Sequence, residues 1–567
     1  MVHSIRTEYT YITTTNRDLN QQSSFEKGEG GKSTYDRGFA CRNATIMTKL
    51  TQGSVSKRAP YLRTQGSAKQ LIVDGEPFLV LGGELHNSSS SSIEYMRPIW
   101  ERLVMLNLNT ALTPVSWELI EPEEGRFDFT LVDGLLQEAR RHNLRLIFLW
   151  FGSWKNGMSS YIPLWVKQDI HRFPYVKLQN GQSIEVLSTL AETAREADGR
   201  AFAALMQHIR AVDGNDHTVI MMQIENEVGV LGDSRDRCDA ANTAFAGQVP
   251  QELIDQLTSH RQELGREVRQ CWEANGFKSA GSWEEVFGKG LQGDEIFMAW
   301  HYARYIDSVA EAGKAEYDIP MFVNAWLSGQ KPGEWPSGGP VPHMLDIWQA
   351  GAPHIDMLSP DIYLDNFQEW CQRYTRRNNP LFIPEMRHGE RGIYNIFYAL
   401  GEHEAIGVSP FAIDSESSED GALSRGYALL RQLAPLILEY QGKSAMIGFR
   451  LDEETPSIRK ELGGYELEIS LDHSFGPQAE RGYGLIIVSE QDEFIGGGYG
   501  FMVNFRSTTR GSAFVGIAAA DEGEYRYGKW IPRRRLNGDE TNQGKLWRFP
   551  IVESCSGIER CTLYRYE

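Results

Sequence analysis

The chain has 567 residues, more than a single domain usually holds, and its hydrophobic content of 41% is enough for large cores. Its formal net charge of -19 argues against a nucleic acid or an anionic membrane as a partner. The six cysteines form no CxxC pair, which indicates neither a zinc nor a redox motif, and no apolar run reaches the length of a membrane span.

Residues 1–58 differ in composition from the rest of the chain. They are polar, rich in Thr, Ser, Gly, Arg and Lys, and show no sustained periodicity, so we predict a disordered tail. The early charged residues are not followed by the apolar stretch of a signal peptide. We therefore expect a cytoplasmic protein, and secretion would require a different N-terminus.

From residue 59 onward, apolar strands alternate with amphipathic helices. The first strand follows a tight turn at Asp74-Gly75. Residues 230–291, after the fourth strand, form a long insertion with helical segments. The predicted strands are residues 78–81, 109–116, 144–151, 219–223, 320–326, 355–359, 380–384 and 407–413. The predicted helices are residues 93–106, 131–142, 200–211, 295–311, 344–349, 367–376, 394–402 and 423–438.

This alternation predicts the fold class. Eight strand–helix units imply a parallel sheet closed into a (β/α)8 TIM barrel. A doubly wound open sheet is disfavoured because residues 82–86, after the first strand, lack the phosphate-binding glycine pattern. After residue 440 the periodicity changes to 2, with glycine-rich turns between short strands. We predict three parts: the tail at 1–58, an α/β barrel at 59–440, and a C-terminal all-β, sandwich-like domain at 441–567.

Two carboxylates stand at the ends of apolar strands. The fourth strand is followed by Glu225, Asn226 and Glu227 in a row, and Glu385 follows the seventh strand. Because a buried strand interior cannot hold carboxylates without a large desolvation cost, these residues should lie where the strands end and a cavity opens. Strands four and seven face each other across the barrel mouth, so a small substrate fits between Glu227 and Glu385.

Paired carboxylates that flank an acetal are what glycosidic cleavage requires. One protonates the leaving oxygen, and the other attacks the anomeric carbon or activates water. We predict carboxyl groups about 5–5.5 Å apart, the spacing of a retaining mechanism. We also predict a protonated Glu227 with a raised pKa, because ionised Glu385 shares the site. Glu225 is the other candidate acid, but Glu227 lies nearer the open strand end, and Glu225 is expected to be a salt-bridging residue behind it.

Two motifs resemble a known family. Gln223-Ile224-Glu225-Asn226-Glu227-Val228-Gly229 is similar to the acid/base motif of glycoside hydrolase family 35 β-galactosidases, which belong to clan A of retaining (β/α)8 glycosidases. Residues 117–122 with residues 125–129 resemble the family's segment after strand two. The resemblance covers roughly residues 70–438. The C-terminal domain resembles the accessory domain of a branch related to bacterial xyloglucan-active β-galactosidases.

The resemblance implies an exo-acting retaining hydrolase whose carbohydrate substrate is a terminal β-D-galactoside. It implies Glu227 as the acid/base, Glu385 as the nucleophile, and Asn226 as a hydrogen-bond donor to the sugar 2-hydroxyl. Where the family reads Ala-Glu-Trp after strand three, this chain reads Gly152-Ser153-Trp154, so recognition of the 4- and 6-hydroxyls is expected to differ. Further substrate contacts are expected from strand-end residues, namely Glu84, Trp117, Trp154, Asn156, Trp326 and Tyr363.

Two neighbours of Glu385 have predicted roles. Arg387 is expected to hold it ionised, and Tyr363 to donate a hydrogen bond to it. We expect no cofactor and no metal, because His86 near Glu84 lacks a third ligand at regular spacing.

Three other functions stay open. Another β-glycosidase, such as an exo-β-glucosaminidase, would suit the altered segment after strand three, and a panel of aryl glycosides would identify it. A non-catalytic carbohydrate-binding barrel is disfavoured by the presence of both carboxylates. A metal-dependent barrel hydrolase would lose activity with a chelator. The sequence indicates no oligomeric state.

Overall fold

The computed structural model describes residues 58–376, 378–416, 421–472, 479–508, 514–551 and 557–567. The predicted tail lies outside the described residues except for Arg58, so that expectation stays a prediction. Residues 56–567 cluster as one unit.

Eight parallel strands close into a barrel, which confirms the predicted fold class. They follow one another around the barrel in chain order, and the last pairs with the first. Because all eight run in the same direction, their carboxyl ends share one rim. The strands are β4 (Val80–Glu84), β5 (Thr110–Ser116), β6 (Arg145–Lys155), β9 (Val219–Asn226), β10 (Met321–Trp326), β11 (Met357–Ile362), β12 (Phe382–Met386) and β13 (Gly407–Pro410).

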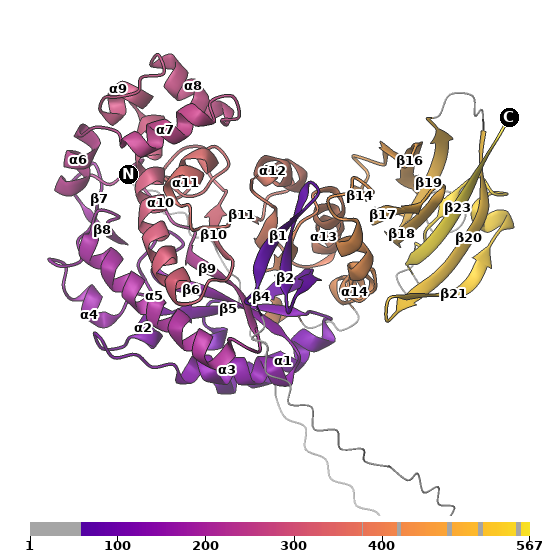
Figure 1. The fold of residues 1–567 in the computed structure, drawn as a ribbon, viewed down its shortest axis with the longest axis horizontal. Coiled ribbons are helices and arrows are strands. Elements are labelled where there is room, and N and C mark those ends of the chain that lie inside the picture. Colours follow the sequence, from indigo (N-terminus) through magenta and orange to yellow (C-terminus); the bar gives the residue numbers. More distant parts are fainter. Residues whose placement is uncertain (1–57, 377, 417–420, 473–478, 509–513, 552–556) are drawn as a thin grey trace, which may run out of the picture. The chain divides into compact units, whose positions relative to one another are not determined.

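Helices surround the barrel on its outside (Figure 1). Helix α1 shows why they form, because Met96, Ile99, Trp100 and Leu103 recur at helical spacing and are all buried. The main helices, each following one barrel strand, are α1 (Ile93–Met105), α3 (Thr130–Arg141), α5 (Glu192–Asp213), α10 (Leu291–Glu316), α11 (Leu345–Gly351), α12 (Phe367–Tyr374), α13 (Glu390–Glu402) and α14 (Ala422–Tyr440). The insertion after β9 is helical as predicted, with α6 (Asp239–Ala246), α7 (Gln251–Ser259), α8 (Arg266–Ala274) and α9 (Trp283–Phe287).

The end of the barrel opposite the shared rim is closed by a small antiparallel sheet. It consists of β1 (Tyr61–Gln65), β2 (Ala68–Val73) and β3 (Glu76–Phe78), with the predicted turn at Asp74-Gly75 between β2 and β3. Leu71 and Val73 of β2 join the cluster of side chains that fills the barrel interior. The predicted first strand is therefore divided, since β3 pairs with β2 and only β4 enters the barrel.

The C-terminal residues form two antiparallel sheets around their own hydrophobic core, as predicted from their period of 2. One sheet holds β14 (Met446–Leu451), β17 (Gly482–Glu490), β18 (Glu493–Tyr499), β23 (Ile558–Tyr566), β20 (Phe514–Arg526) and β21 (Lys529–Leu536). The other holds β15 (Ser457–Leu462), β16 (Tyr465–Leu471), β19 (Phe501–Ser507) and β22 (Trp547–Arg548).

Helix α13 of the barrel packs directly against the β-domain. The ring of Tyr483 in β17 lies 4.6 Å from that of Tyr394 and 5.1 Å from that of Phe397, both in α13. The backbones approach closely at Gly401 and Gly448, where a Cβ on Gly401 would lie 2.6 Å from the Gly448 Cα. Only glycine fits this crossing, so the sequence fixes where the helix meets β14.

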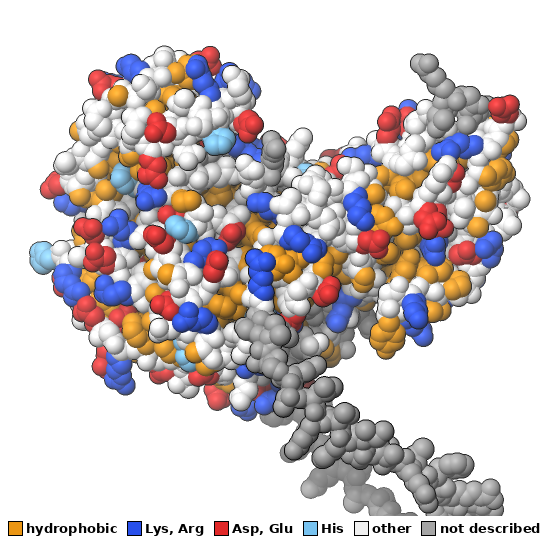
Figure 2. Space-filling model, viewed as in Figure 1, with side chains coloured by type: hydrophobic (Ala, Val, Ile, Leu, Met, Phe, Trp, Pro, Cys, Tyr) orange, Lys and Arg blue, Asp and Glu red, His pale blue; other side chains and the backbone are white. Residues whose placement is uncertain are grey.

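The surface carries charges of both signs. On the face shown in Figure 2, basic and acidic side chains are interspersed over both the barrel and the β-domain. Among the described residues, no helix has both the length and the low polarity needed to cross a membrane.

Candidate active site

The two predicted carboxylates meet at the shared rim. Glu227 follows the last residue of β9, and Glu385 lies near the end of β12. One carboxylate oxygen from each of Glu227, Asp361 and Glu385 lies within 4.8 Å of the others. All three side chains are buried. Such oxygens are ligands that a hard divalent cation uses, so these three are the residues that could hold a metal.

The backbone bends sharply where β9 ends. Glu225 has φ 60° and Glu227 has φ 47°, left-handed values that cost a non-glycine residue about 1–3 kcal/mol. The N–H of Glu227 donates to the Asn324 side-chain oxygen at 2.9 Å, which holds this conformation. As a result Glu225 turns toward the surrounding helices, whereas Asn226 and Glu227 reach the barrel mouth.

Glu227 lies in surroundings that suit a proton donor. Burial raises its pKa to about 7, and the nearby Glu385 carboxylate acts in the same direction. The Lys155 ammonium and the hydrogen bond donated by the Asn156 amide act against this rise. The predicted direction of the shift agrees with the structure, but burial is a larger cause than the like charge named from the sequence.

Glu385 is surrounded by donors. The Tyr363 hydroxyl donates to its Oε2 at 2.8 Å, and the side-chain amides of Asn226 and Asn324 donate to its Oε1 at 3.2 and 3.4 Å. Accepting three hydrogen bonds suits an ionised carboxylate, which has only acceptor sites.

Lys155 is the cation of the site, and the sequence analysis did not select it. Its Nζ donates to the Asn226 side-chain oxygen at 3.0 Å. Burial lowers the Lys155 pKa, but the carboxylates of Glu385, Glu227, Glu84 and Asp361 outweigh this and raise it. The role predicted for Arg387 is wrong, because its guanidinium donates to the Tyr363 carbonyl at 2.7 Å and pairs with Asp365 at 3.5 Å.

Two further buried carboxyls complete the cluster. Burial, followed by the charge of Glu385, raises the pKa of both Glu84 and Asp361 well above the ordinary range. Asp361 accepts a hydrogen bond from the Asn324 amide at 2.7 Å through one oxygen. The other Asp361 oxygen and both Glu84 oxygens accept no hydrogen bond from the described residues. These atoms are available to a polar ligand.

Glu225 belongs to a separate buried pair behind the site. Its two oxygens accept the backbone N–H groups of Ser153 and Trp154 at 3.0 and 2.7 Å. Burial and then the Asp198 carboxyl raise the Glu225 pKa well above its ordinary value. Glu225 is thus not the acid of the mouth, and its partner is a carboxyl rather than the expected cation.

The same pair explains why residue 152 departs from the family motif. A Cβ on Gly152 would lie 2.6 Å from a Glu225 oxygen and 2.8 Å from an Asp198 oxygen. An alanine here would force these buried side chains to shift. Ser153, at the acidic position of the motif, donates to Asp198 at 2.6 Å, while Lys155 and Asn156 of the same segment reach the mouth.

We expect Asp198→Ala to destabilise the barrel by about 2–4 kcal/mol, because it removes the buried acceptor of the Trp150 indole N–H and of the Ser153 hydroxyl. Urea unfolding followed by tryptophan fluorescence measures this. Asp198→Asn, which keeps an acceptor for the indole, should lose much less. Equal stability of the alanine variant and the native chain would contradict a stabilising role for these two buried hydrogen bonds.

Four aromatic residues were predicted to contact the substrate, and the structure places them in two kinds of surroundings. Trp117 and Trp154 are fully buried and donate to the Glu121 carboxylate and the Leu187 carbonyl. Neither presents a ring face to the cavity, so both predictions as substrate contacts are wrong. Trp326 ends β10 beside Asp361 and is partly exposed, and Tyr363 contacts Glu385.

Comparisons with known proteins find β-galactosidases similar to parts of this chain. A family model described as Beta-galactosidase, that of glycoside hydrolase family 42, matches residues 94–286. A second, described as Domain of unknown function (DUF5597), matches residues 423–548. The chain is 30% identical over 166 residues to beta-galactosidase 8 of Oryza sativa subsp. japonica, covering 29% of this chain and 23% of that protein. It is 34% identical over 91 residues to a beta-galactosidase of Xanthomonas manihotis, covering 16% and 15%.

The chain thus spans less than a quarter of the length of these relatives. A solved beta-galactosidase from Rahnella sp. R3 aligns with a TM-score of 0.44 and 15% identity, covering 63% of this chain and 57% of that one. Over these segments the chain is similar to β-galactosidases, and its eight parallel strands form a (β/α)8 barrel. The finer assignment to family 35 is not confirmed, because the matching family model is that of family 42.

Proposed function

We propose that this chain is a retaining, exo-acting glycoside hydrolase that removes terminal β-D-galactose. The observation that carries the proposal is the approach of Glu227 and Glu385, which bring one oxygen each within 4.8 Å. Retaining glycosidases hold their carboxyl groups about 5–5.5 Å apart, whereas inverting ones need about 6.5–9.5 Å to admit a water. The spacing therefore supports double displacement.

In the proposed first step, a Glu385 oxygen attacks the anomeric carbon while the Glu227 proton passes to the departing glycosidic oxygen. The sugar is then bound covalently to Glu385. In the second step Glu227, now ionised, takes a proton from a water that attacks the same carbon and releases Glu385. The two inversions return the β-configuration. The pKa of about 7 at Glu227 supports both roles, since a group that gives and takes a proton works best near the operating pH.

The remaining side chains are proposed to bind the sugar. The Asn226 amide lies against Glu385, where the 2-hydroxyl of a bound galactoside would lie. Lys155 supplies a donor, while Glu84 and Asp361 supply acceptors for other hydroxyls. We retain family 35 and the xyloglucan-active branch as the finer proposal, resting on the motif at residues 223–229. Galactosides of varied linkage, including xyloglucan oligosaccharides, test it.

One observation favours a second candidate, an exo-β-glucosaminidase. Four carboxyls (Glu84, Glu227, Asp361 and Glu385) surround a single Lys155, so the mouth is rich in acceptors that would stabilise the ammonium of an amino sugar. Initial rates on aryl β-galactoside, β-glucoside and β-glucosaminide distinguish the candidates. Hydrolysis of the glucosaminide alone would overturn galactose as the substrate while leaving the retaining mechanism in place.

The acid form of Glu227 gives a pH prediction. Its folded pKa is raised to about 7, so the protonated form is lost as the pH rises through that value. We expect kcat/KM for an alkyl galactoside to fall on the alkaline side of about pH 7, approaching tenfold per unit. A dinitrophenyl galactoside, whose leaving group needs little protonation, should show a much weaker fall. Identical alkaline limbs for the two substrates would contradict Glu227 as the acid.

A further inference from the structure

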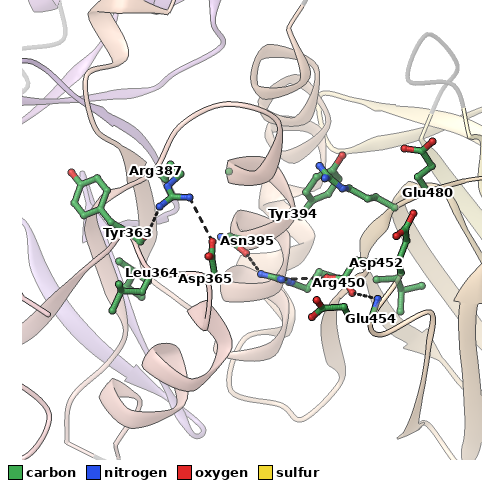
Figure 3. Close-up of a pocket in the computed structure, with 15 residues that line it drawn as sticks. Tyr363, Leu364, Asp365, Arg387, Tyr394, Asn395, Arg450, Asp452, Glu454 and Glu480 are labelled. Atoms are coloured by element: carbon green, nitrogen blue, oxygen red, sulfur yellow. Dashed lines mark hydrogen bonds and ion pairs between the residues drawn. The ribbon is translucent and has the colours of Figure 1, made fainter. Parts of the chain in front are cut away.

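A second polar cavity lies between the barrel rim and the β-domain, with a volume of about 420 Å³ (Figure 3). Its barrel side includes residues 362–365, Arg387 and the start of α13. Its β-domain side comes from the end of β14, the turn after it, and Glu480 with Arg481. The catalytic carboxylates are not among its lining residues.

Hydrogen bonds across the domain junction build the floor of this cavity. Arg450 of β14 donates to the Asn395 side-chain oxygen of α13 at 2.7 Å, and its guanidinium lies 3.4 Å from an Asp452 oxygen. Asp452 also accepts the backbone N–H groups of Glu454 and Thr455 at 3.1 and 2.8 Å, which fixes the turn that forms the far wall. The donors and acceptors of the floor are therefore held in place before any ligand arrives.

One wall of the cavity leads to the catalytic centre. Arg387 donates to the backbone carbonyl of Tyr363 at 2.7 Å, and the Tyr363 hydroxyl donates to Glu385 at 2.8 Å. Figure 3 shows the Tyr363 ring directed away from the cavity while Arg387 and Asp365 face it. A ligand in the cavity would contact residues 362–365, the segment whose Tyr363 hydroxyl donates to Glu385.

The charge and polarity of the side chains that line the cavity indicate which class of ligand it can bind. Three arginines and five acidic side chains line the cavity, so the acidic excess disfavours an anion. Among the described residues, the group of acidic side chains close enough to hold a metal is Glu227, Asp361 and Glu385, none of which lines this cavity. The polar walls disfavour an apolar ligand. Among uncharged ligands, molecules whose groups both donate and accept hydrogen bonds fit best, and sugar hydroxyls do both.

An aromatic ring adds to the same preference. Tyr394 lines the cavity with the Arg481 guanidinium 6.0 Å above its ring. A sugar presents C–H groups on one face and hydroxyls at its edge, which matches an aromatic face set among charged donors and acceptors.

We propose that this junction cavity is a second saccharide-binding site, which takes neutral sugar units beyond the terminal sugar that is cleaved. The proposal rests on the proposed function for the identity of that terminal sugar. The units come either from the extension of the reacting substrate or from a separate glycan chain. In both cases the β-domain contributes binding through Arg481 and Glu454 rather than only covering α13.

The test uses the full-length chain with Arg481→Ala, Glu454→Ala and the control Arg459→Ala. The first two residues are exposed, and the Arg459 side chain is 58% exposed on β15, away from the cavity. Calorimetric titration with an oligosaccharide that lacks the terminal galactose measures binding without turnover. We expect about tenfold weaker binding in both cavity variants and unchanged binding in the control.

Steady-state kinetics identify the source of the sugar. If the substrate's own extension occupies the cavity, KM for a galactose-terminated oligosaccharide rises about tenfold in both cavity variants, while an aryl galactoside is unaffected. Weakened binding with an unchanged KM supports the site with a separate glycan as occupant. Equal binding in all variants, or none in the native chain, overturns the site. Loss of the proposed function is seen separately, as an absence of turnover of every aryl glycoside by the native chain.

Discussion

Replacing Glu385 with Gln should reduce hydrolysis of every substrate by about 10⁴-fold or more, because the carboxylate that bonds to the anomeric carbon is removed. The fold is expected to persist, since a glutamine at this position has nearly the same shape and its single amide oxygen still accepts from either Tyr363 or Asn226. Initial rates on an aryl galactoside and on an oligosaccharide measure the loss, which should be equally severe for both because either leaving group departs in the step in which Glu385 bonds to the anomeric carbon.

Glu118→Gln is the matched control. Glu118 is also a carboxylate after a barrel strand, but it pairs with Lys167 at 3.6 Å at the surface and should be dispensable. In the native chain, a 2-fluoro-galactoside with a good leaving group should accumulate as a covalent adduct on Glu385, visible by mass spectrometry of the digested protein. An adduct on any other residue would place the nucleophile elsewhere.

The barrel could be predicted from the sequence because apolar residues recur at a different spacing in strands than in helices. Each of the eight strands lies within a few residues of its expected place, and β9 with β12 bring Glu227 and Glu385 together. Strand ends were less certain. The first strand is divided because β3 pairs with β2, and the last stops at Pro410 because Ala412 takes φ 59°, which no pattern in residues 407–413 announces.

The direction of side chains at the rim was harder to predict. Strands buried on both faces carry apolar residues throughout, so alternation cannot tell the inner face from the outer one. Along β6 the register against β9 shifts between Trp150 and Lys155. Selection of residues by their place at the strand end therefore included Trp154, which faces the helices, and passed over Lys155, which faces the carboxylates.

Asn324 is a site residue that the sequence could have indicated but that the sequence analysis did not select. An amide inside the apolar strand at residues 321–326 must find partners, and its partners are the Glu227 backbone, Asp361 and Glu385. Arg387 failed for a different reason. It stands two residues after Glu385 in the chain, but its side chain turns outward to the Tyr363 carbonyl and is 55% exposed.

Glu227→Gln should separate the two chemical steps. With a dinitrophenyl galactoside the leaving group needs no proton, so Glu385 still attacks and the glycosyl-enzyme forms. The second step then stalls, because Gln cannot take a proton from water. We expect a burst of dinitrophenol equal to one enzyme equivalent, followed by a steady rate about 10²–10⁴-fold below that of the native chain. Alkyl galactosides, which need the acid in the first step, should show no burst.

With azide, the configuration of the product formed by the same variant shows which carboxylate is the nucleophile. It attacks without needing a base, so it should restore steady turnover of the dinitrophenyl galactoside by the Glu227→Gln variant. The trapped sugar is bonded to Glu385 on its α-face, so azide approaches from the opposite face and the product is β-galactosyl azide. In the Glu385→Gln variant azide would take the place of the missing carboxylate and give the α-azide. Because the two carboxylates lie on opposite sides of the bond that is cleaved, each product reports which one was removed. An α-azide from the Glu227→Gln variant would mean that Glu227 is the nucleophile and Glu385 the acid, and that the raised pKa of Glu227 serves binding rather than proton transfer.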